Sequence, residues 1–136
     1  MSRLLVSVSL VTGLTLPVQA HTVQRAGEVA ALWHVEPNHN PRAGQPALVW
    51  VALTRRGGQP IPNRQVDCRL TVRREPQGKE MLTTRLAGIN VEQYRDTPSA
   101  KITFPQPGRY QLLLACQPKI AGLRPFRFAY SVTVGR

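Results

Sequence analysis

Acidic residues are scarce in this sequence. Its 136 residues include seven Asp and Glu against 18 Lys and Arg, so the formal charge is +11 at neutral pH. The carboxylates stand singly, and we find no paired acids, nucleophile elbow, HExxH motif, phosphate-binding loop or dinucleotide fingerprint. We therefore expect a protein that is not an enzyme.

Long apolar runs are also scarce, and the clearest one stands at the start of the chain. Arg3 precedes an apolar stretch over residues 4–16, and residues 18–20 supply a small-residue cleavage site. This pattern is typical of a secretory signal peptide. An uncleaved membrane anchor is the alternative, but the run is shorter than the roughly 20 residues that span a bilayer. We predict a signal peptide over 1–20 and a single periplasmic or secreted domain over 21–136, monomeric and without a transmembrane segment.

The sequence has only two cysteines, Cys68 and Cys116, and no C-x-x-C motif. The missing motif leaves thiol-exchange catalysis without support. Outside the cytoplasm, an even pair of cysteines predicts a disulfide. Two separate buried thiols are the alternative.

Sustained helical periodicity is absent too, and 12 prolines do not suit a helical protein. Most segments instead alternate between apolar and polar residues with the period of a strand. Seven strand candidates follow from this pattern: 27–36, 47–54, 66–72, 79–86, 99–104, 109–117 and 126–134. Residues 47–54 are apolar on both faces, as in a central strand covered on both sides. Residues 87–97 are interpreted as a helical turn or a loop crossing between sheets.

Turns rich in Gly, Pro and Asn separate these candidates. The fold class that this predicts is all-β, an immunoglobulin-like β-sandwich of about seven antiparallel strands. Tyr110, which follows a turn at Gly108, is expected to bury its ring and to bond its hydroxyl to a neighbouring loop backbone.

Arginine supplies 15 of the 18 basic residues. If the strands near 64–74, 109–117 and 125–134 share a sheet, their outward parity places four arginines on one face: Arg69, Arg73, Arg109 and Arg127. Guanidinium groups suit bidentate contact with carboxylate or phosphate. This face is therefore a candidate docking site for an acidic protein or an anionic envelope surface such as lipid head groups. An ordinary solvated face is the alternative, and nucleic acid fits the charge but not the secretion signal.

The three histidines are the metal-ligand candidates. Cleavage after residue 20 would leave His21 with a free α-amine beside its imidazole, and this nitrogen pair suits a tetragonal Cu(II) site. The arrangement resembles half of the histidine brace of copper-resistance β-sandwiches and lytic monooxygenases. A brace needs a further histidine, which here means His34 or His39. We expect His39 to be exposed in its loop and His34 to lie on the surface of its strand, with the parity opposite to Trp33. A histidine carried by chance on a mobile terminus is the alternative.

The turn motifs carry a family resemblance. Ala43-Gly44-Gln45-Pro46 precedes an apolar strand, Gly58-Gln59-Pro60-Ile61 follows it, and Gly108-Arg109-Tyr110 comes late in the chain. Over residues 29–134 this series resembles small secreted domains of the YtkA-like and FixH-like type and secreted proteins of cyanobacteria. The resemblance implies an immunoglobulin-like module, and several such relatives are linked to copper handling or cytochrome oxidase assembly. It carries over no ligand set, because the methionine- and histidine-rich motifs of copper carriers are missing.

Together these features predict a non-enzymatic extracytoplasmic β-sandwich module that binds another macromolecule or an envelope component. The alternative function is a periplasmic copper-binding or copper-delivery protein that uses the N-terminal His21 as a Cu(II) ligand.

Overall fold

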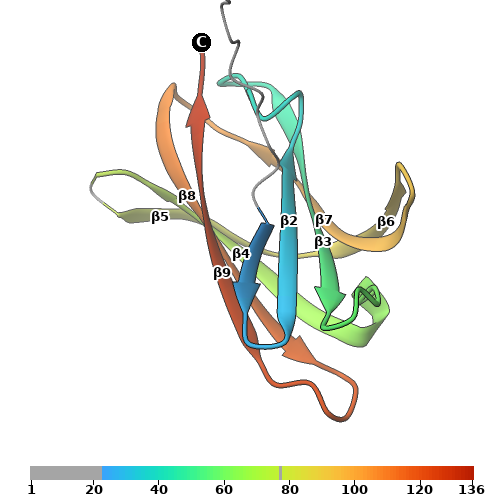
Figure 1. The fold of residues 1–136 in the computed structure, drawn as a ribbon. Coiled ribbons are helices and arrows are strands. Elements are labelled where there is room, and N and C mark those ends of the chain that lie inside the picture. The colour runs from blue at the N-terminus through green and yellow to red at the C-terminus, as the bar shows by residue number, and fades with distance from the viewer. Residues whose placement is uncertain (1–22, 77) are drawn as a thin grey trace, which may run out of the picture.

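The computed structural model describes residues 23–76 and 78–136, so the predicted signal peptide and His21 lie outside the described residues. Within them, nine strands form two antiparallel sheets that pack face to face (Figure 1). The first sheet contains, in spatial order, β1 (Val23–Ala26), β2 (Val29–Val35), β3 (Pro46–Arg55), β7 (Tyr94–Thr103) and β6 (Ala87–Val91). The second contains β5 (Lys79–Arg85), β4 (Val66–Arg74), β8 (Gly108–Pro118) and β9 (Phe126–Val134). A short 3₁₀ turn, η1 (Asn63–Gln65), leads into β4.

The order of the strands is that of an immunoglobulin domain. If β2 is taken as strand A, the first sheet has the order A-B-E-D, and the second has C-F-G with one further strand beside C. The predicted fold class is therefore confirmed. The predicted number of strands is too small by two, because β1 and β6 were not among the seven candidates.

The interpretation of residues 87–97 as a helical turn or crossing loop is wrong. These residues form β6 and the start of β7, a hairpin in which Val91 lies opposite Tyr94. Glu92 turns the chain with a positive φ of 51°, a conformation that usually falls to Gly or Asn. The Asn90 side chain closes the hairpin by accepting a hydrogen bond from the Asp96 N–H at 3.0 Å. Since Glu stands at the turn, the sequence carries no ordinary hairpin signal there.

The core lies between the two sheets and follows the predicted alternation. Every second residue of Val66–Val72 in β4, of Tyr110–Cys116 in β8 and of β9 faces inward and is buried, with the exception of the half-buried Tyr130. β3 is buried on both faces over most of its length, as its apolar sequence predicts. Tyr110 is fully buried, and its hydroxyl donates to the Gln106 carbonyl at 2.7 Å, which is the loop contact expected for it.

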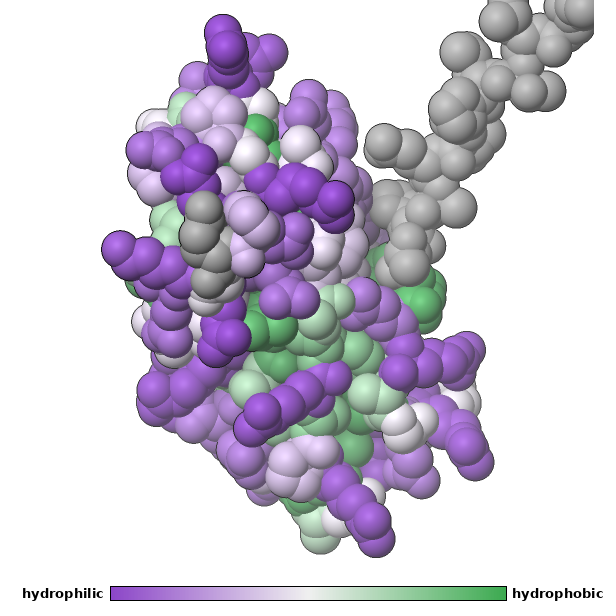
Figure 2. Space-filling model, turned by 90° about the vertical axis from the view of Figure 1, so that its left-hand side faces the viewer, coloured by the Kyte–Doolittle hydropathy of each residue, from purple (hydrophilic) through white to green (hydrophobic). Residues whose placement is uncertain are grey.

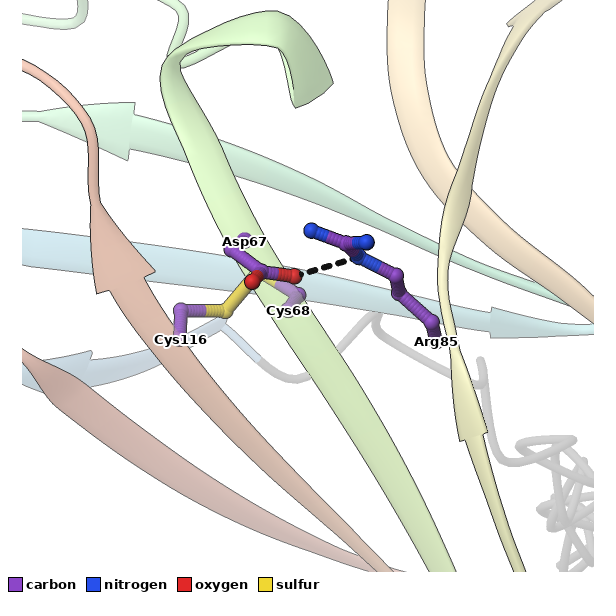
Figure 3. The surroundings of a disulfide bond; sticks show 4 residues. All are labelled: Asp67, Cys68, Arg85 and Cys116. Carbon is purple, nitrogen blue, oxygen red and sulfur yellow. Dashed lines mark hydrogen bonds and ion pairs between the residues drawn. A yellow bond between two sulfur atoms is a disulfide. The ribbon is translucent and has the colours of Figure 1, made fainter.

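Cys68 and Cys116 lie directly opposite each other on the neighbouring strands β4 and β8 and form a disulfide (Figure 3). Both residues are buried in the core. In antibody domains the conserved disulfide joins the two sheets. Here the bond cross-links two strands of one sheet, and the ion pair between Asp67 and Arg85 lies on the other side of β4.

Candidate functional site

His34 lies on the outer face of the first sheet, as its parity predicts. It is opposite Trp50 of β3 in the strand register, and the two rings stack with centroids 3.9 Å apart and planes 2° apart. Trp50 is itself fixed, because its Nε1–H donates to Glu36 Oε1 at 3.3 Å and the Tyr94 ring packs against it. These contacts leave Trp50 fully buried although it faces away from the core. The indole is therefore a rigid platform that sets the plane of the His34 imidazole.

The turn after β2 brings His39 next to His34. The His39 N–H donates to the Val35 carbonyl at 2.7 Å, and both Asn38 and His39 have positive φ angles, 51° and 56°. The ring centroid of His39 consequently lies 5.0 Å from that of His34. His39 is half-buried, so the expectation that it is exposed is wrong. The backbone of this turn is strained, since non-glycine residues seldom adopt such angles.

Tyr130 of β9 orients the His39 ring. Its hydroxyl lies 3.2 Å from His39 Nδ1, and its own ring stacks on Trp33 with centroids 5.3 Å apart. Burial raises the pKa of Tyr130 above its ordinary value, so the hydroxyl keeps its proton at neutral pH. A hydrogen bond to one ring nitrogen is the usual way in which a protein orients a metal-ligating histidine. Ligation by His39 through Nε2, a buried atom, would then require that Nδ1 carries the proton and donates it to the Tyr130 oxygen.

Both imidazoles line an open pocket of about 590 Å³ on this side of the molecule, together with Glu36, Glu92 and Tyr94. In the part of the chain that the structure describes, no group of three or more His, Cys, Asp or Glu side chains is arranged to hold a metal ion. The described residues thus bring two nitrogen ligands together.

The described part of the chain starts close to this pocket. β1 starts at Val23, which lies opposite Leu32, two residues before His34 on β2. His21 lies outside the described residues, but it is only two residues before Val23, and two residues span at most about 7 Å. The described chain therefore starts beside the strand that carries His34.

The four predicted arginines all lie on the outer face of the second sheet, because β4, β8 and β9 do share that sheet. Their surroundings differ, however. Arg109 forms an ion pair with Glu75 at 3.6 Å, and Arg73 lies opposite Glu80 in the register. Two of the four arginines therefore have acidic neighbours on this face. Arg69 and Arg127 lie on either side of Ala115 and form a distinct pair.

No protein-family model matches the chain, and no curated protein matches it. Solved structures of the same fold do match it. One is uropathogenic Escherichia coli FetP, expressed in the periplasm, with 13% identity and a TM-score of 0.62 over 85% of this chain and 94% of that one. A copper-bound variant of FetP has 12% identity and a TM-score of 0.61 over 85% and 95%. A DUF4426-family protein of Pseudomonas aeruginosa has 15% identity and a TM-score of 0.58 over 84% and 96%.

These comparisons show a small β-sandwich, as the resemblance to YtkA-like and FixH-like domains implies, and they leave those family names as a prediction. Among the described residues, no helix is long and apolar enough to cross a membrane.

Proposed function

We propose that this protein binds copper outside the cytoplasm, with His34, His39 and the N-terminal His21 as ligands. One observation carries the proposal: two of the three histidines in the sequence, from different local structures, have ring centroids 5.0 Å apart. Both rings are fixed by aromatic neighbours, His34 by Trp50 and His39 by Tyr130. Rings held in this way lose little freedom when a metal binds.

The donor set favours copper over harder cations. Imidazole suits Cu, Zn, Fe and Ni, and a tetragonal set of nitrogen donors is typical of Cu(II). Signal-peptide cleavage before His21 would add an amine and a third imidazole, four nitrogens in all. The copper-bound variant of FetP shows that a protein of this fold can hold the metal. At 12% identity it does not indicate which residues of this chain would do so.

Three features support an extracytoplasmic location. The N-terminal 20 residues have the pattern of a secretory signal peptide. The disulfide between Cys68 and Cys116 suits an oxidising compartment. A protein of the same fold was produced in the periplasm.

Copper titration of the mature protein that starts at His21 tests the proposal. We expect one Cu(II) per chain with an electron paramagnetic resonance spectrum typical of tetragonal nitrogen ligation. His34→Gln and His39→Gln should each weaken binding about tenfold or more, the loss of roughly 1.4 kcal/mol. One extra residue before His21 should weaken binding similarly, because it removes the free α-amine next to the imidazole.

The control variant is Gln106→Ala. It changes an exposed loop residue and leaves all three histidines in place. It should bind copper like the unchanged protein. If the double variant His34→Gln/His39→Gln binds copper as tightly as the unchanged protein, the proposed site is wrong.

A further inference from the structure

The centre of the outer face of the second sheet holds two arginines at a fixed spacing. Ala115 of β8 lies directly opposite Arg69 of β4 and directly opposite Arg127 of β9. Neighbouring strands are about 4.8 Å apart, so the backbones at the two arginines are separated by about 10 Å. Both side chains are exposed, and only the methyl group of Ala115 lies between them. The two guanidinium groups can therefore approach one anionic group from both sides.

The acidic residues of this face have other partners at hydrogen-bonding or ion-pair distance, although Asp67 lies near enough to Arg69 for the two charges to interact. Asp67 accepts a hydrogen bond from Arg85 Nε at 2.7 Å, and Glu75 pairs with Arg109. Glu80 accepts from the Thr83 hydroxyl at 2.7 Å. In the described part of the chain, neither Arg69 nor Arg127 forms an ion pair. Both remain available for an anion from outside.

An apolar area adjoins the two arginines. Leu113, two residues before Ala115 on β8, is half-buried and lies opposite the exposed Ala129 of β9. Figure 2 looks onto the side of the molecule where β5, β8 and β9 lie in Figure 1, and shows an apolar area bordered and crossed by hydrophilic side chains. An apolar centre with arginine around it is the composition of a protein interface rather than of a solvated face.

We propose that this face docks an acidic protein. Carboxylates of the partner would bridge Arg69 and Arg127, and apolar side chains of the partner would cover Leu113 and Ala129. Charge complementarity favours a protein over a lipid surface. A membrane presents phosphate to the whole face and so also to Asp67, Glu75 and Glu80, whereas a protein can place its carboxylates at the two arginines alone. The proposal is independent of copper binding.

The probe is a blocked, fluorescein-labelled octapeptide in which glutamate alternates with leucine and alanine, followed by fluorescence anisotropy at low salt. We expect saturable binding that weakens as salt is raised, since exposed charges are screened. Arg69→Gln/Arg127→Gln should weaken binding about tenfold or more. The matched control, Arg56→Gln/Arg95→Gln, removes the same charge from two exposed arginines at a turn and on the first sheet, and should change affinity by less than about threefold.

Three outcomes would overturn the proposal. They are an equal loss in both double variants, no peptide binding at low salt, and phosphatidylglycerol vesicles that bind more tightly than the peptide through the same two arginines. Circular dichroism of each variant establishes that it is folded. The variant His34→Gln/His39→Gln should bind the peptide like the unchanged protein, which separates this proposal from the one about copper.

Discussion

At the scale of single residues, the Asp67–Arg85 pair gives a prediction with a defined sign. The hydrogen bond from Arg85 is the main reason that the pKa of Asp67 is lower than its ordinary value of 3.8, with smaller contributions from the charges of Arg85, Arg69 and Lys119. A lowered pKa in the folded state stabilises the protein above pH 3.8, and this contribution is lost as pH falls through the lowered value. Arg85→Gln should raise the pKa of Asp67 back toward 3.8, as measured by NMR titration of its side-chain carboxyl. An unchanged midpoint would show that Arg85 is not the cause.

The candidate metal site also shows what single residues reveal in a sequence. His34 could be placed on an outer face, because the alternation of β2 is regular and its inward residues are apolar. The position of His39 could not be predicted, because it depends on two positive φ angles at Asn38 and His39 and not on any periodic pattern. The stacking of His34 on Trp50 could not be predicted from the sequence either, since it depends on the register between β2 and β3.

At the scale of strands, sequence pattern was informative wherever one face is buried. The inward residues of β4, β8 and β9 are mostly apolar and their outward residues mostly polar, with Leu113, Ala115 and Ala129 as outward exceptions, so these strands could be recognised. β1 and β6 have no fully buried residue, and nothing in their composition distinguishes them from loops. They are strands because they extend the edges of the first sheet, where backbone pairing with β2 and β7 decides their conformation.

The β6–β7 hairpin provides a prediction at the same scale. A Cβ on Gly88 would collide with the Asp96 carboxyl group, which accepts hydrogen bonds from the backbone N–H and the guanidinium of Arg64 at 3.0 and 3.3 Å. Gly88→Ala should therefore displace Asp96, separate the hairpin from η1 and lower the free energy of unfolding by about 1–2 kcal/mol, as measured in urea.

The control for this change is the same substitution in an Asp96→Ala background. With the carboxyl group gone, Gly88→Ala should cost clearly less, because the new methyl then meets only the Asn63 Cβ at 3.3 Å and the unfolded chain loses the freedom of a glycine. An equal cost in both backgrounds would show that Asp96 is not the group that the new methyl meets.

At the scale of the whole molecule, the disulfide joins two parts of the chain that are far apart in sequence. Cys68 and Cys116 are 48 residues apart in sequence, and the segment between them includes β5, β6 and β7 from both sheets. Fixing the ends of a loop of this length removes freedom from the unfolded chain worth roughly 4 kcal/mol on the chain-entropy model. Cys68→Ala/Cys116→Ala should lower the free energy of unfolding by about this amount.

Reduced protein with both cysteines present separates the cross-link from core packing. It keeps the two sulfur atoms between the sheets and loses only the covalent bond. If the cross-link dominates, the reduced protein and the double alanine variant should have similar denaturation midpoints, both well below that of the oxidised protein. If the reduced protein is as stable as the oxidised one and only the alanine variant is weaker, then the sulfur atoms stabilise the sandwich by packing in the core, and the loop closure contributes nothing measurable.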